Sequence, residues 1–151
     1  MAFDLYQPRV YRDLVSALGQ ENVFILSAGW GLIRSDFLIP DYNITFSRQA
    51  VVWARRPKRL NLPLTDLNHL AGEATSLEEP VHFFGGRDYL PLFHALMEHV
   101  PAPVIVHHKG SRPPYRGFAY EAFSGRRNQN WHYQAAAAFI RANAKTQWSG
   151  S

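Results

Sequence analysis

Apolar residues recur along the chain with a helical period at the N-terminus and in short runs further on. A first helix is predicted from Pro8 onward, because Val10, Leu14 and Leu18 then share one face. Proline suits the first turn of a helix, and Gly19 is a residue type that ends one. The N-terminal segment is therefore expected to pack one face of a helix against the rest of the protein.

Three short apolar runs predict buried strands at residues 23–26, 81–84 and 104–106. A helix is expected after each run. The first begins with Thr65 as its N-cap and continues through Leu67, Leu70 and Ala71. The second spans residues 89–100 and stops before Pro101, and the third spans residues 131–143. The alternation of strands and helices predicts parallel pairing between the strands.

The pattern indicates a small single-domain α/β protein, a three-layer sandwich with a mostly parallel sheet. The domain is expected to cover residues 1–144, followed by a flexible C-terminal tail at residues 145–151. Ligands of open parallel sheets bind outside the carboxyl ends of the strands. Those ends are residues 27–29, 85–87 and 107–109, so a site is expected where they meet.

The segment that follows the first strand has no clear period and is predicted to be a long functional loop at residues 29–46. Its aromatic rings can stack a base, and Asp36 and Asp41 are the candidate catalytic carboxylates. The residues expected to bind substrate here are Ser27, Gly29, Trp30, Gly31, Tyr42 and Thr45. The alternative is a tight turn with Trp30 buried and both acids capping turns.

Two further segments carry candidate chemistry. Gly86 and Arg87 follow the second strand at the start of a helix, where an anion such as phosphate would be favoured. Residues 124–133 carry donors and a stacking ring into the last helix, with Asn130 as a substrate-binding residue and His132 as a proton-transfer group. The alternative for this segment is Asn130 as an N-cap, with Trp131 in the core.

The basic residues are mostly arginine, 13 of 16, and the formal net charge is +4. Guanidinium binds phosphate in a bidentate manner and stacks on bases, which suits a nucleic-acid ligand. The alternative is a merely solvated surface. The expected phosphate contacts are Arg112, Arg116, Arg126 and Arg127. No cysteine and no HExxH spacing occurs, so neither a metal nor a cofactor is expected.

No apolar run approaches the roughly 20 residues that span a bilayer, and the N-terminus has charges where a signal peptide is apolar. A cytoplasmic protein without a membrane partner is therefore expected.

Three stretches together resemble the YaaA-like peroxide-stress proteins and their small relatives: LYQPRVYRDL at residues 5–14, VFILSAGWGLIRSDFLIPDYNITF at residues 23–46, and VHFFGGRDYLPLF at residues 81–93. The resemblance covers about the first two thirds of the chain and is most specific at residues 27–46. It implies an α/β fold, DNA binding and protection from DNA damage. The fold that this resemblance implies also looks similar to the sheet of uracil-DNA glycosylases, and to a domain attached to archaeal tRNA-guanine transglycosylases.

One feature of that family is missing, because its members usually begin with a strand that carries a Cys-Ser-x-x-Lys motif. This chain has no cysteine and starts almost at Leu5, the point that follows the motif. No role of the motif is carried over. A sheet without that strand would expose an edge, which favours a homodimer or a partner that supplies the strand.

Three functions remain open. The leading hypothesis is a nucleic-acid-acting enzyme, a DNA base N-glycosidase that processes damaged or modified bases, with DNA favoured over RNA. The second is a stress-response protein that binds DNA or RNA without catalysis. The third is a small hydrolase or sensor that binds a free nucleotide or nucleoside.

Overall fold

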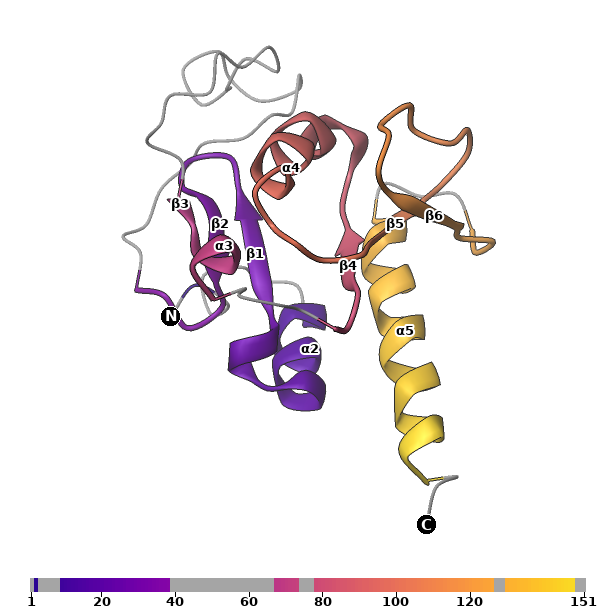
Figure 1. The fold of residues 1–151 in the computed structure, drawn as a ribbon. Coiled ribbons are helices and arrows are strands. Elements are labelled where there is room, and N and C mark those ends of the chain that lie inside the picture. Colours follow the sequence, from indigo (N-terminus) through magenta and orange to yellow (C-terminus); the bar gives the residue numbers. More distant parts are fainter. Residues whose placement is uncertain (1, 3–8, 39–66, 74–77, 127–129, 149–151) are drawn as a thin grey trace, which may run out of the picture.

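The strands of this protein form two small sheets, with helices between and beside them (Figure 1). The computed structural model describes residues 2, 9–38, 67–73, 78–126 and 130–148. Helices and strands together confirm the predicted α/β class, and the sheet in the C-terminal half is entirely parallel. The strands that were expected to share one sheet are divided between two.

The first sheet has the order β1-β2-β3, formed by β1 (Phe24–Ser27), β2 (Gly31–Arg34) and β3 (Leu67–Asn68). β1 confirms the first predicted strand. Its partner β2 is antiparallel and lies inside the predicted loop at residues 29–46, so that prediction is wrong for residues 31–34. Leu32 and Ile33 are both buried, on opposite faces of a four-residue strand. A strand buried on both faces shows no alternation of polar and apolar residues, and the pattern therefore hid it.

The second sheet has the order β4-β5-β6, formed by β4 (Val81–Phe84), β5 (Val104–His108) and β6 (Ala119–Ala122). The first two strands confirm the predictions. β6 lies between the third predicted strand and the last predicted helix, where no strand was predicted. Tyr120 is the one residue of β6 that is not exposed, so no apolar run marks the strand. Backbone pairing with β5 forms it.

The first and last predicted helices are present. They are α2 (Val10–Leu18), which ends at Gly19, and α5 (Trp131–Trp148), which continues past the predicted end at residue 143. Tyr11 of α2 packs edge-on against Tyr133 of α5, with ring centroids 5.9 Å apart. The 3-10 turn η1 (Gln20–Asn22) connects α2 to β1.

After β4 come the 3-10 turn η3 (Arg87–Tyr89) and α4 (Leu90–Met97), which confirm the helix predicted after that strand. The helix predicted from Thr65 is corrected, because Leu67 and Asn68 form β3 and the helix α3 (His69–Glu73) begins only afterwards. The Asn68 side chain accepts a hydrogen bond from the Ala71 amide (3.1 Å). It thus caps α3, the role predicted for Thr65, which lies outside the described residues.

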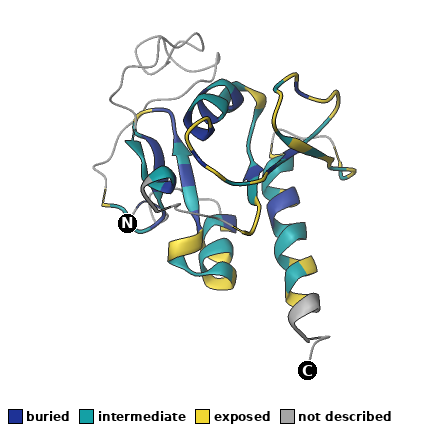
Figure 2. Ribbon diagram, viewed as in Figure 1, coloured by how far each residue is buried: buried dark blue, intermediate teal, exposed yellow. Residues whose placement is uncertain are grey.

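The main core surrounds α4. Leu92, Phe93 and Leu96 of this helix pack with residues of both sheets, including Leu32 of β2 and Val106 of β5. The facing sides of α4 and the strands are buried, whereas the outer side of α2 is exposed (Figure 2). A smaller cluster of Ala2, Ile25 and Ile33 fills the other face of the first sheet. α4 therefore joins the two sheets into one core.

Across the described residues, no helix combines the length and the apolar character that crossing a membrane requires.

Candidate functional site

The three parallel strands end side by side and bring their following loops to one edge of the second sheet. We call this the carboxyl edge and define it as residues 85–87, 108–112 and 123–126. Phe84 pairs in register with His107, and His107 with Glu121, so the loops begin at nearly the same level. Neighbouring strands are about 4.8 Å apart, and the carboxyl edge is therefore about 10 Å wide.

Arg87 occupies the first loop of the carboxyl edge, directly after β4. Its guanidinium donates hydrogen bonds to the carbonyl oxygen of Ser111 and to the Ser111 hydroxyl oxygen (2.9 Å). Ser111 belongs to the loop after β5, so these bonds hold two of the three loops together. Both partners are uncharged, so they hold the guanidinium in place without neutralising its positive charge.

Lys109 follows β5 and reaches toward the loop after β6. Its ammonium donates a hydrogen bond to the Gly125 carbonyl oxygen and lies 5.4 Å from the centre of the Phe123 ring. A cation above an aromatic face is attracted by the negative potential of the ring. The second and third loops are thus connected by another cation with neutral partners.

Arg112 lies over the ring of Tyr120, with its guanidinium carbon 4.7 Å from the ring centre. The ring is itself fixed, because the Tyr120 hydroxyl donates a 2.6 Å hydrogen bond to the Tyr115 carbonyl oxygen. Burial raises the pKa of Tyr120 and keeps the hydroxyl in its donor form. A guanidinium held over a fixed ring is already positioned for contact with a phosphate, which it can bind in a bidentate manner.

The cations of the carboxyl edge contact the neutral partners described above. Two ion pairs of the described part of the chain join Arg9 to Asp13 (3.5 Å) and Arg34 to Asp36 (2.6 Å), and neither includes a cation of the edge. Arg126, at the end of the third loop, is exposed. The edge therefore presents a cluster of fixed positive charge to an incoming anion.

The two glycines at the start of the first loop differ in the space that a side chain would have at each position. A Cβ on Gly85 would lie 2.5 Å from the Phe83 ring, whereas a Cβ on Gly86 would meet nothing within 4 Å. The backbone of Gly86 has φ −71°, which any residue adopts. Packing accounts for Gly85, and neither packing nor conformation requires glycine at position 86.

Gly85→Ala is expected to lower the free energy of unfolding by about 1–3 kcal/mol, the usual cost of overpacking a core. Phe83 cannot move freely, because it is buried and stacks on Phe93 with ring centroids 4.3 Å apart. Urea unfolding measures the change, and Gly86→Ala is the control that is expected to stay within about 0.5 kcal/mol of the parent. Equal effects of the two substitutions would contradict this reading of the turn.

The substrate-binding residues predicted at the end of β1 form a hairpin turn instead of the end of a parallel strand. The Ser27 hydroxyl oxygen accepts hydrogen bonds from the amides of Gly29 and Trp30, both 3.2 Å long. Gly31 has φ +90°, a conformation that favours glycine, and it pairs with Ser27 across the hairpin. The end of β1 therefore belongs to a different sheet from the carboxyl edge.

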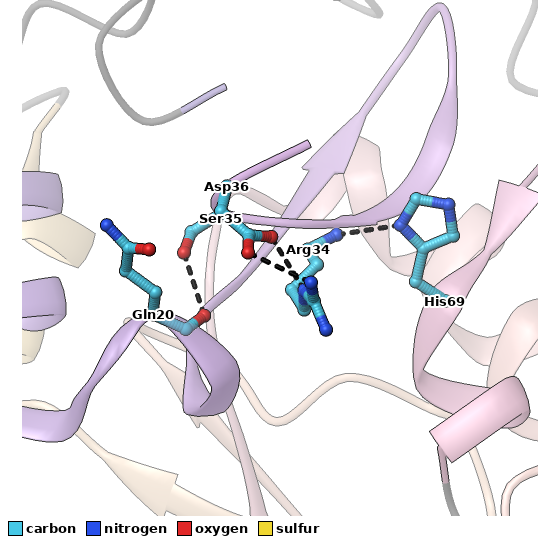
Figure 3. A network of polar contacts seen from close by, with 5 residues as sticks. All are labelled: Gln20, Arg34, Ser35, Asp36 and His69. Carbon is cyan, nitrogen blue, oxygen red and sulfur yellow. Dashed lines mark hydrogen bonds and ion pairs between the residues drawn. The ribbon is translucent and has the colours of Figure 1, made fainter. Parts of the chain in front are cut away.

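Asp36 lies beyond the far end of the same hairpin, where Arg34 pairs with Phe24. Its carboxylate accepts two hydrogen bonds from the Arg34 guanidinium, 2.6 and 2.9 Å long (Figure 3). These bonds hold the pKa of Asp36 below its usual value. At least about 10 Å of strand separates this carboxylate from Trp30, so the structure does not bring the two together.

Neighbouring contacts anchor the same segment to the fold. The Ser35 hydroxyl donates to the Gln20 carbonyl oxygen (2.9 Å), and the Arg34 amide donates to Nδ1 of His69 (3.0 Å; Figure 3). The contacts of this network connect β2 to η1 and α3.

The remaining predicted residues are partly described. Arg116 and Asn130 are exposed, and the Asn130 carbonyl oxygen accepts a hydrogen bond from the Tyr133 amide (3.1 Å) at the start of α5. Outside the described residues lie the predicted catalytic, substrate-binding and phosphate-binding residues Asp41, Tyr42, Thr45 and Arg127.

Two histidines, His82 of β4 and His107 of β5, lie between the second sheet and α5, on the face of the sheet opposite α4. Nδ1 of His82 is 3.0 Å from Nε2 of His107, and Phe139 of α5 packs on the His82 ring with centroids 4.4 Å apart. Burial lowers the pKa of both, and Glu121 partly offsets this. His82 was assigned no role from the sequence. The strand register places it on the same face as His107, two positions before Phe84, the residue that pairs with His107.

Two further imidazoles are those of His108, within the carboxyl edge, and His132, in the first turn of α5. Nδ1 of His108 and Nδ1 of His132 are buried and have no hydrogen-bond partner among the described residues. Burial lowers the pKa of His132, the predicted proton-transfer group. In the described part of the chain, no three His, Asp or Glu side chains come together in a way that could hold a metal ion.

Comparison of the chain with protein families, with curated proteins and with solved structures found no match. The resemblance to the YaaA-like proteins therefore stays a prediction.

Proposed function

We propose that this protein binds nucleic acid, with the phosphates seated along the carboxyl edge of the second sheet. One observation carries the proposal: Arg87, Lys109 and Arg112 come from the loops of this edge, and neutral partners fix each of them. Cations that are already held in place lose little conformational freedom when an anion binds. Their charge stays available for that anion.

The dimensions of the carboxyl edge suit a chain of phosphates. A width of about 10 Å accommodates a short run of nucleotides, since successive phosphates are several ångströms apart. Release of condensed counterions then favours binding and makes it salt-dependent. The predominance of arginine over lysine agrees with this ligand, because the planar guanidinium matches phosphate oxygens in pairs.

Binding is better supported than base removal. A glycosidase needs a carboxylate beside the gripped base, but Asp36 is paired with Arg34 and lies at the far end of a hairpin from Trp30. Its pKa is lowered, which does not suit a proton donor. The proposal therefore contains no catalytic step.

The proposal is tested by fluorescence anisotropy of labelled oligonucleotides between about 50 and about 200 mM salt. Arg112→Gln and Arg126→Gln are each expected to weaken binding about tenfold and to lower the slope of log affinity against log salt by about 1. Both effects follow from the loss of one phosphate contact.

Arg141→Gln is the matched control, because it removes the same charge from an exposed position of α5 about 15 Å from the start of that helix. Its affinity and slope are expected to match the parent protein. A loss of equal size in all three variants would show only a general effect of net charge, and unchanged binding in Arg112→Gln and Arg126→Gln would contradict the proposal.

A further inference from the structure

An aromatic pair borders the fixed cations. Phe123 directly follows β6, and Trp131 opens α5; their ring centroids are 6.2 Å apart and their planes differ by 29°. Both side chains are only half-buried, so part of each ring is accessible. The ammonium of Lys109 lies 5.4 Å from the Phe123 ring centre. A flat apolar surface and a phosphate-binding cation therefore adjoin each other.

The orientation of this pair is set by its surroundings. A Cβ on Gly125 would lie 2.4 Å from the Phe123 ring, so the backbone of the third loop packs directly on that ring. Gly125 also accepts the hydrogen bond from Lys109. Phe123 continues the pairing of the strands, since its amide donates to the His108 carbonyl oxygen (2.8 Å). The ring is thus held by β5, by its own loop and by Trp131.

We infer that the nucleic acid bound here is single-stranded, with a base stacked on the pair formed by Phe123 and Trp131 while Lys109 and its neighbours hold the adjoining phosphates. This rests on the proposed function. An aromatic side chain can stack only on a base whose face is free, and in a duplex the neighbouring base pairs cover both faces. Duplex binding would leave the aromatic pair without a role.

The geometry selects a strand rather than a free nucleotide. The fixed cations come from the first and second loops of the carboxyl edge, and the exposed Arg126 comes from the third, so positive charge extends over about 10 Å, more than one phosphate group can contact. Stacking is tolerant of base identity, so little sequence preference is expected. No described contact distinguishes ribose from deoxyribose, and DNA and RNA strands are therefore compared in the test.

The experiment measures anisotropy with a labelled single-stranded DNA of about 15 nucleotides, the same strand annealed to its complement, a matching RNA strand and a free mononucleotide. The parent protein is expected to bind the single strands at least about tenfold more tightly than the duplex or the mononucleotide. Trp131→Leu is expected to weaken single-strand binding about tenfold, while the salt slope, which reports phosphate contacts, stays unchanged.

Two further variants separate stacking from folding. Trp131→Phe keeps an aromatic ring and is expected to restore binding to within about threefold of the parent. Trp148→Leu makes the same substitution at the other end of α5, about 26 Å away, and is expected to change nothing. Circular dichroism checks that each variant is folded.

The possible outcomes separate the two proposals. Equal affinity for single strand and duplex, with a slope that still depends on Arg112, would overturn the stacking inference and leave phosphate binding standing. Tightest binding to the mononucleotide would also overturn it. Absence of binding to every nucleic acid would overturn the proposed function, and the inference with it.

Discussion

Leu92→Ala is expected to lower the free energy of unfolding by about 3 kcal/mol and to leave both sheets unfolding in one transition. Leu92 is completely buried in α4, where it belongs to the cluster that contains Leu32 of the first sheet and Val106 of the second. Removal of its branched side chain loses the burial of apolar surface and leaves a cavity that the surrounding strands only partly fill. The effect should reach both sheets because α4 packs on each.

Urea unfolding followed by circular dichroism and by tryptophan fluorescence measures this change. Leu38→Ala is the matched control, because Leu38 is 77% exposed and its replacement is expected to cost no more than about 0.5 kcal/mol. Two separate transitions in Leu92→Ala, or a cost near that of the control, would show that α4 does not join the sheets into one cooperative core.

Stability is expected to fall as the pH is lowered below about 6.5, by up to about 1.4 kcal/mol per pH unit for the buried His107 and by less for His82, which is only half-buried and more screened by solvent. Burial lowers the pKa values of His82 and His107 in the folded protein, so the unfolded chain binds more protons in the window below 6.5. The free energy of unfolding therefore rises with pH through this window, and the contribution of the two histidines is fully present above it. His132, whose pKa is also lowered by burial, adds to the slope.

The geometry of the pair reinforces this effect. The contact between Nδ1 of His82 and Nε2 of His107 needs one nitrogen to accept a hydrogen bond, so it does not survive protonation of both rings. The carboxylate of Glu121 raises the pKa of His107, whereas the charge of His108 in β5 lowers it. The neutral ring of Phe139 is what α5 places against His107. Acidification is thus expected to loosen α5 from β4 and β5.

Urea unfolding at a series of values from about pH 7.5 to about pH 5.5 gives the slope. His82→Gln and His107→Gln are each expected to reduce it, because glutamine forms hydrogen bonds without titrating in this range. His99→Gln, at an exposed position after α4, is the control that should leave the slope unchanged. A pH-independent parent protein, or a slope unaffected by the first two substitutions, would contradict the prediction.

The strands that face α4 were the most predictable part of this fold. Residues 81–84, between Pro80 and Gly85, and residues 104–106, after Pro103, are mostly apolar runs, and each forms a strand of the parallel sheet. The helices after β4 and before the C-terminus followed from their periodic apolar faces. Such elements carry their signal locally, because burial on a defined face dictates which residue types occur there.

Part of the candidate site was also predictable. Arg87, Arg112 and Arg126 were expected near phosphates, and the carboxyl ends of parallel strands indicated where to look. Tyr120 and Phe123 gave no such signal, because an aromatic residue in a polar segment does not show which cation it will support. Only the pairing of β6 with β5 places Tyr120 beneath Arg112 and Phe123 beside Lys109.

By itself, the sequence determined the α/β class, the places of the long helices and the group of four arginines between residues 112 and 127. Tertiary structure alone decided the rest: the hairpin that separates Asp36 from Trp30, the addition of β6, and the division of the strands into two sheets around α4. The physical reason is that strand partners are chosen by contacts between distant segments. The residue types around a position in the chain indicate whether that position is buried. Its partners in a sheet depend instead on how distant segments of the chain pack together.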